Sequence, residues 1–135
     1  MTDPEMKEMF QTVRTIATVG FSTNPARPGY YVPEYLMLKG YRVIPVNPTI
    51  QDALGQKAYP DLLSVPEKVD VVQIFRRPED VPAIVDQAIK IGAKVIWMQI
   101  GATHPEAVKN AQTAGLGVVT DKCMMIEHKR LFGTR

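Results

Sequence analysis

A glycine followed by small polar residues is the first place in the sequence where chemistry can be expected. Residues 20–27 read Gly-Phe-Ser-Thr-Asn-Pro-Ala-Arg. Gly20 can adopt dihedral angles that other residues avoid, and it lets a ligand approach the backbone closely. The backbone N–H groups of such a turn can cradle a phosphate, and Arg27 adds a planar set of donors. The segment predicts a phosphate site, and the alternative is an ordinary turn between a strand and a helix.

An arginine pair is the second group of candidates. Arg76 and Arg77 directly follow residues 70–75, Asp-Val-Val-Gln-Ile-Phe, which read as a strand. A guanidinium forms charge-assisted hydrogen bonds with phosphate, whereas the alternative is a solvated pair that only caps the end of a strand. Because side chains alternate along an extended chain, we expect only one of the two to face a ligand.

The remaining nucleophilic and titratable residues form no recognisable catalytic set. His104 precedes a helix pattern and is expected to cap it or to lie on the surface, and His128 lies among charged residues typical of a solvated helical face. Cys123, the single cysteine, stands at an expected helix start that favours a thiolate, or it is a buried structural residue. The sequence contains no serine nucleophile elbow, Walker motif or metal-ligand set.

These candidates must be positioned by strands and helices that alternate along the chain. Strands are predicted at residues 15–20, 41–46, 70–75, 94–99 and 117–120, and helices near residues 3–13, 30–39, 78–91, 105–114 and 123–131. Asp3 is expected to cap the first helix. The pattern predicts a single α/β domain over residues 1–135, built on a Rossmann-like, doubly wound, five-stranded parallel sheet.

The expected order of the strands, numbered along the chain, is 3-2-1-4-5. The switch point then lies between the first and fourth strands, and ligands bind outside the carboxyl ends of the strands there. This rule points to residues 20–27 and 99–103. Pro45, inside the second strand, indicates an edge position or an irregular strand end.

Composition and charge restrict the class of ligand. The chain has 135 residues, of which 45% are hydrophobic and 22% charged, and its net charge is +2. These values are typical of a globular protein, and they favour neither nucleic acid nor a membrane as a partner. The N-terminus has no apolar signal core and no run reaches the roughly 18 apolar residues that span a membrane, so a cytoplasmic location is expected.

The sequence argues against a nicotinamide dinucleotide. That class of site requires G-x-G-x-x-G and an acidic residue at the end of the second strand, which holds the ribose. Here one glycine opens the turn, and the second strand ends in Val46-Asn47-Pro48-Thr49, which contains no carboxylate.

Five short motifs at the predicted strand ends resemble one family of proteins. They are Gly20-Phe21-Ser22, Pro45-Val46-Asn47-Pro48, Phe75-Arg76-Arg77-Pro78, Trp97-Met98-Gln99-Ile100-Gly101 and Asp121-Lys122-Cys123. In this order they resemble the stand-alone CoA-binding proteins, which are similar to the CoA-binding N-terminal domain of the succinyl-CoA synthetase α subunit. The resemblance covers residues 10–131.

The resemblance implies that coenzyme A is the ligand and gives each motif a part of it. Gly20, Ser22, Thr23 and Asn24 would hold the pyrophosphate with help from Arg27, and Phe21 is a further binding residue of the same turn. The adenosine would be bordered by Val46, Asn47 and Pro48, and the adenine would be flanked by Phe75, Arg76, Arg77 and Pro78, which also reach toward phosphate. The pantetheine arm would be lined by Met98, Gln99 and Gly101. Cys123 stands where the synthetase has an Asn-Cys-Pro turn.

One departure from the family pattern concerns the 3′-phosphate. The synthetase follows its Asn-Pro with a Gly-Lys whose lysine approaches that phosphate, whereas Thr49 and Ile50 follow here. Lys57 and the arginine pair are the candidates to replace that lysine.

The resemblance implies binding of CoA or acyl-CoA without turnover, as a regulator or carrier. The synthetases catalyse with a phosphorylated histidine on a second domain and with a partner subunit. The alternatives are a subunit of an acyl-CoA ligase with a separate partner, a nicotinamide-dependent oxidoreductase, and a sensor of another nucleotide such as ADP. A protein partner or a homo-oligomer is compatible with the binding function.

Overall fold

The strands form where β-branched residues are concentrated, and Gly or Pro residues lie in most of the loops that connect the strands to the helices. The structure, a computed structural model, describes residues 1–133. In chain order the elements are α1 (Asp3–Thr12), β1 (Thr15–Val19), α2 (Pro28–Leu38), β2 (Arg42–Val46), β3 (Asp52–Ala53), β4 (Gln56–Lys57), the 3-10 helix η1 (Leu62–Ser64), β5 (Val71–Ile74), the 3-10 helix η2 (Pro78–Asp80), α3 (Val81–Lys90), β6 (Val95–Met98), α4 (Pro105–Thr113), β7 (Gly117–Thr120) and α5 (Met124–Phe132).

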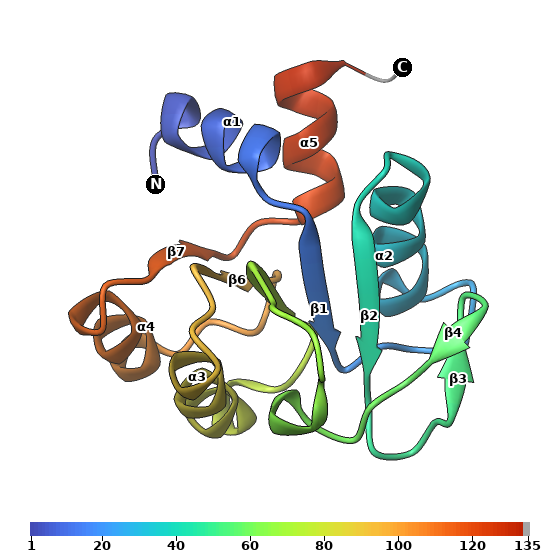
Figure 1. Cartoon of the computed structure of the whole chain (residues 1–135). Coiled ribbons are helices and arrows are strands. Elements are labelled where there is room, and N and C mark those ends of the chain that lie inside the picture. The colour runs from blue at the N-terminus through green and yellow to red at the C-terminus, as the bar shows by residue number, and fades with distance from the viewer. Residues whose placement is uncertain (134–135) are drawn as a thin grey trace.

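Five strands form one parallel sheet in the order β2-β1-β5-β6-β7. The central strand register places Thr18 opposite Pro45 on one side and Gln73 on the other. β3 and β4 form a separate two-stranded antiparallel hairpin. The prediction of an α/β fold with a five-stranded parallel, Rossmann-like sheet is confirmed, and Figure 1 shows the strands between two layers of helices.

The predicted order 3-2-1-4-5 is wrong, because the third long strand, β5, pairs with β1 instead of with β2. The carbonyl of Pro45 points to the outer edge of β2, where it accepts from the Tyr59 N–H at 3.0 Å. A further strand at this edge would need an N–H at the same position, and proline has none. The outer edge of β2 bonds to the segment around Tyr59, which forms a parallel bridge with Val46, while β5 pairs with β1, so the switch point lies between β1 and β5.

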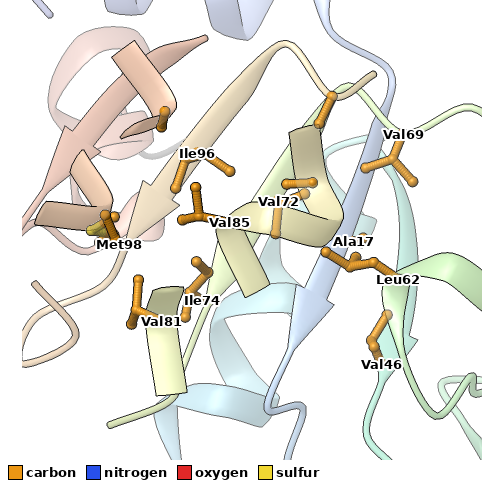
Figure 2. Packing of buried hydrophobic residues seen from close by; sticks show 14 of the residues in the cluster. Ala17, Val46, Leu62, Val69, Val72, Ile74, Val81, Val85, Ile96 and Met98 are labelled. Atoms are coloured by element: carbon orange, nitrogen blue, oxygen red, sulfur yellow. The ribbon is translucent and has the colours of Figure 1, made fainter. Parts of the chain in front are cut away.

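Each face of the sheet carries its own hydrophobic core. On one face β5 and β6 pack under α3 and α4, and Figure 2 shows Val81 and Val85 of α3 over Ile74 and Ile96. On the other face α1, α2 and α5 cover the sheet around the fully buried Trp97. The Trp97 Nε1 donates to the Lys122 carbonyl at 2.8 Å. Both faces are thus covered, as is typical of parallel sheets, and the strand ends are left for loops that can hold a ligand.

The first and last helices lie side by side, and an ion pair joins them (Figure 1). Thr2, and not Asp3 as predicted, caps α1, because its hydroxyl accepts from the Glu5 N–H while the Glu5 carboxylate accepts from the Thr2 N–H. Asp3 instead takes two hydrogen bonds from the Arg130 guanidinium, at 2.7 and 2.8 Å. These bonds lower the pKa of Asp3 below its ordinary value.

His128 is buried, and its prediction as part of a solvated helical face is wrong. Only 9% of the residue is exposed, and its Nδ1 lies 2.8 Å from the Tyr35 hydroxyl. Its ring contacts those of Phe10 and Phe132, with centroids 5.1 and 4.9 Å away. The charged neighbours in sequence misled the prediction, because adjacent residues of a helix do not share a face. Burial lowers the pKa of His128.

Candidate functional site

The carboxyl ends of the strands surround a cavity of about 860 Å³, a size in the range of small-molecule sites. The loops after β1, β2, β5, β6 and β7 reach it, together with the first turns of α2 and α5. It brings together thirteen of the seventeen residues expected from the sequence, namely Gly20, Phe21, Ser22, Thr23, Arg27, Asn47, Phe75, Arg76, Arg77, Pro78, Gln99, Gly101 and Cys123. Residues far apart in sequence therefore meet at the edge where ligands of such sheets bind.

Four expected residues do not line this cavity. The Asn24 side chain instead accepts from the Ala26 N–H at 3.0 Å and stabilises the turn from within. Met98 is fully buried in the core under α3 and α4. Val46 and Pro48 border a separate, smaller hollow of about 200 Å³. Met98 is the last residue of β6, and strand alternation turns its side chain into the core on the face opposite to that of Trp97.

Gly20 allows the turn after β1 to pass close to the end of β5. Its φ is +84°, and a Cβ built on it would lie 2.3 Å from the Phe75 carbonyl oxygen. Real Cβ atoms do not approach so closely, so any other residue would displace one of these two loops. The glycine thus brings the backbone of the turn to the switch point between β1 and β5.

The first turn of α2 is held against the same turn by a proline inside the helix. Pro33 has no N–H, so the carbonyl four residues earlier, at Gly29, lacks its helical donor. The Gly29 carbonyl instead accepts from the Ser22 N–H at 3.1 Å. The proline therefore converts a lost helical bond into a link between the helix and the turn after β1.

This first turn presents the positive end of α2 to the cavity. Arg27 is the N-cap residue, and its side chain makes no capping hydrogen bond. Across residues 1–133, no protein group accepts from the N–H of Thr23 or Gly29. Helix N-termini with free N–H groups bind anions, and phosphate is the typical ligand.

Asn47 ties the end of β2 to the turn after β1. Its Nδ2 donates to the Phe21 carbonyl at 2.9 Å, and its Oδ1 accepts from both the N–H and the hydroxyl of Thr49, at 2.9 and 2.7 Å. Asn47 therefore holds two loops of the site in place, in addition to lining the cavity.

Both members of the arginine pair line the cavity, although strand alternation predicted only one. The reason is that β5 ends at Ile74, so the chain has left strand geometry before the pair, and Arg77 already caps η2. Asp80 accepts from Arg76 Nη2 at 3.1 Å and from Arg77 Nε at 3.4 Å. These pairs are exposed and therefore weak, so either guanidinium can exchange its partner for a phosphate at little cost.

Lys57, the other candidate for the 3′-phosphate, does not line the cavity. Its Nζ lies over the Tyr59 ring, 5.3 Å from the centroid. Of the candidates named for that phosphate, the arginine pair alone is among the lining residues.

The lining contributed by the loop after β6 and the start of α5 includes an apolar end of the cavity, formed by Ile100, Ala102, Cys123 and Ile126. Ile100 and Ile126 have 66% and 52% of their surfaces exposed. Cys123 is 8% exposed, so it is both buried and at the cavity wall, where it is the N-cap residue of α5. In the described part of the chain, the lining after β1 and β5 is cationic and carries the unpaired N–H groups of Thr23 and Gly29, whereas these four residues are apolar.

Sequence reasoning missed six lining residues, namely Pro28, Gly29, Tyr31, Thr49, Ile50 and Ile126, and it gave no role to Ile100 and Ala102 within the stretch 99–103 that it assigned to the site. Two of them had a detectable signal. Tyr31 follows Arg27 by four residues and Ile126 follows Cys123 by three, and these spacings place helical residues on one face. Thr49, Ile50, Ile100 and Ala102 lie in loops and carry no such periodic signal.

The described part of the chain offers a binding site without an evident catalytic group. His104 caps α4, where its Nδ1 accepts from the Ala107 N–H at 3.2 Å, as expected for one of its two roles. Residues 1–133 contain no cluster of three or more His, Cys, Asp or Glu side chains that could hold a metal ion. Over the same residues, none of the helices has the length and apolar character to span a membrane.

Comparisons with known proteins identify the family of the chain. The chain is 37% identical over 124 residues to the uncharacterized protein YneT of Bacillus subtilis, covering 92% of each chain. A hypothetical protein from Pyrococcus horikoshii has a similar solved structure, with 44% identity, a TM-score of 0.96, and coverage of 98% of this chain and 94% of that one. The chain is also 28% identical to the ADP-forming acetate–CoA ligase II of Archaeoglobus fulgidus, covering 82% of this chain but only 17% of that enzyme.

The family model described as CoA binding domain matches residues 14–129, which include all five strands of the sheet and every loop that lines the cavity. This chain therefore belongs to the CoA-binding domain family and is related to a segment of the acyl-CoA ligases.

Proposed function

We propose that the chain binds coenzyme A or acyl-CoA in the cavity at the carboxyl edge of the sheet, without turning it over. The observation that carries the proposal is the polarity of the cavity. Within residues 1–133, the lining after β1 and β5 combines unpaired N–H groups, the N-terminus of α2 and three arginines, whereas the lining at the start of α5 carries no charge. Coenzyme A has a matching division between its charged phosphates and its uncharged pantetheine arm.

The proposed placement puts the pyrophosphate at residues 20–23 and Arg27. The arginine pair then lies beside the 3′-phosphate, and the pantetheine arm runs toward Gln99 and Cys123. Charge-assisted bonds from guanidinium groups to phosphate are among the stronger hydrogen bonds of proteins.

The proposal favours CoA over NAD. A dinucleotide site holds the ribose with a carboxylate at the end of the second strand. Asn47 occupies that place here, and its amide is already bonded to Phe21 and Thr49. The ribose hydroxyls of NAD would therefore find no free carboxylate at this position.

A second candidate function is the CoA-binding part of an acyl-CoA ligase that acts with a separate subunit. The match to 17% of the length of the acetate–CoA ligase favours it. In that case the apolar end of the cavity would face the partner subunit, and acyl transfer would require groups supplied by the partner.

Calorimetry of the purified protein with CoA, acetyl-CoA, ADP and NAD tests the proposal. We expect CoA and acetyl-CoA to bind most tightly, and native mass spectrometry is expected to detect CoA retained from the expression host. Tighter binding of NAD or of ADP than of CoA would refute it. Hydrolysis or transfer of the acetyl group by the protein alone would contradict a role without turnover.

A further inference from the structure

We infer that Gln99 donates a hydrogen bond from its Nε2 to a carbonyl oxygen of the bound ligand's arm, and that a buried chain of side chains fixes its orientation. The inference rests on the proposed function, because CoA and acyl-CoA carry carbonyl groups along the arm and the nucleotide half does not. The inference therefore states that this position of the cavity wall is a hydrogen-bond donor and that the ligand supplies the acceptor.

The orientation of the Gln99 amide follows from the Met124 N–H. This backbone group lies in the first turn of α5 and donates to Gln99 Oε1 at 2.9 Å. If the amide were flipped, two donors would face each other and the Met124 N–H would lose its acceptor. The amide oxygen therefore points to α5, and the NH₂ group points elsewhere.

A second contact supports the same orientation from within the sheet. Gln73 Nε2 donates to Gln99 Oε1 over a long 3.4 Å, and Gln73 Oε1 accepts from the Thr18 hydroxyl at 2.8 Å. Thr18 and Gln73 are fully buried on adjacent strands, where unpaired polar groups are costly. The three side chains therefore form a chain with one direction, which starts at Thr18 and ends at Gln99.

The NH₂ group of Gln99 is left for a ligand. Gln99 is 4% exposed and lines the cavity. In the described part of the chain no protein group accepts from its Nε2. Among the fully enclosed side-chain N and O atoms of that part, Thr103 Oγ1 alone lacks a hydrogen-bond partner, so the unpaired Gln99 Nε2 is not fully enclosed. The Nε2 therefore opens on the cavity. A nearly buried donor without an acceptor is satisfied by an acceptor on the ligand.

The test compares CoA with 3′-phospho-ADP, which has the nucleotide half of CoA but not the arm. Gln99→Glu keeps an oxygen for the Met124 N–H and replaces the donor with an acceptor. We expect the affinity of this variant for CoA to fall at least about tenfold, and its affinity for 3′-phospho-ADP to change less than about twofold. Gln112→Glu, on the exposed side of α4, is the control that adds the same charge away from the cavity.

Thr18→Val provides a second variant with a nearly identical shape, far from the ligand. It removes the hydroxyl that fixes Gln73, so we expect a smaller loss of CoA affinity, again without a loss for 3′-phospho-ADP. Acetyl-CoA separates the two sources of the carbonyl: a larger loss for acetyl-CoA than for CoA assigns the bond to the thioester, and an equal loss assigns it to an amide of the arm.

Unchanged CoA affinity in Gln99→Glu, or an equal loss for CoA and 3′-phospho-ADP, would overturn the inference while the unmodified protein still bound CoA. Failure of the unmodified protein to bind CoA would instead reject the proposed function itself. Thermal unfolding of each variant shows whether the fold is retained.

Discussion

Replacement of Gly20 by alanine should destabilise the protein through a contact that can be isolated from backbone strain. An alanine at a φ of +84° is strained, at a cost of about 1–2 kcal/mol. The lower entropy of the unfolded chain returns about 0.4–1 kcal/mol. The new Cβ would also lie 2.3 Å from the Phe75 carbonyl oxygen and 3.0 Å from Arg76 Cδ. Relief of such overlap in packed structure costs about 1–3 kcal/mol, so the net loss is about 1–4 kcal/mol.

Gly115→Ala is the matched control. Its φ of +89° is nearly the same, and a Cβ there meets no atom within 4 Å. The strain and entropy contributions are therefore shared, and the difference between the two variants isolates the overlap at the switch point. We expect Gly20→Ala to be less stable than Gly115→Ala by about 1–3 kcal/mol.

Equilibrium unfolding in urea, followed by circular dichroism, measures both free energies, with equal m-values as the check that the two variants unfold alike. If Gly20→Ala were as stable as Gly115→Ala, the close approach of the two loops would not constrain this position, and the reasoning would be refuted. Calorimetry with CoA should show weaker binding in Gly20→Ala alone, because displacement of the turn moves its N–H groups.

Three further predictions concern single side chains. Arg76→Ala and Arg77→Ala should each lower the affinity for CoA more than the affinity for adenosine, because a charge-assisted hydrogen bond to phosphate is worth about 1.5–3 kcal/mol. If calorimetry shows that neither substitution changes the CoA affinity by as much as about threefold, the pair is a solvated strand cap. Burial lowers the pKa of His128 below the ordinary 6.5, so the unfolded chain binds the proton more tightly. The contribution of His128 to stability is complete above pH 6.5 and decreases as the pH falls below it; urea unfolding at several pH values should show this slope, and an equal slope in His128→Phe would contradict the assignment. Asp70→Ala should lower the unfolding free energy by about 1–3 kcal/mol, because the N–H groups of Arg14 and Thr15 at the start of β1, bonded to Asp70 Oδ2 at 2.9 and 3.0 Å, lose their acceptor. A thermal midpoint equal to that of the unmodified protein would disprove this role.

The elements and the edge of the site were predictable from the sequence, because both follow from local patterns. β-branched runs identify the strands, and in a parallel sheet all the loops after strands meet at one edge. Gly20 and Asn47 could thus be assigned to the site without knowledge of the strand order. The order itself is not local, since it depends on which edge of β1 accepts the third long strand. Pro45 contained the relevant signal, and it decides the order only when its carbonyl is known to face outward.

Two other features could not be predicted, for different physical reasons. His128 lies in a charged stretch, and only its spacing from Met124 and Phe132 reveals the buried face that it shares with them. The polarity of the Gln99 amide depends on a backbone donor of α5, which folds back from a distant part of the chain. No pattern within a strand contains that information.

The outer edge of β2 has a consequence for self-association. The exposed edge of a sheet is a template on which strands of other chains can add, and this leads to aggregation. Along β2 the Val43 carbonyl accepts from the Gln56 side chain, the Pro45 carbonyl accepts from the Tyr59 N–H, and the Asn47 N–H donates to the Tyr59 carbonyl at 2.8 Å. With the proline lacking a donor and these groups already bonded, the strand of a second molecule finds no continuous ladder. Pro45 and these bonds thus disfavour the addition of a strand from another copy of this chain along β2.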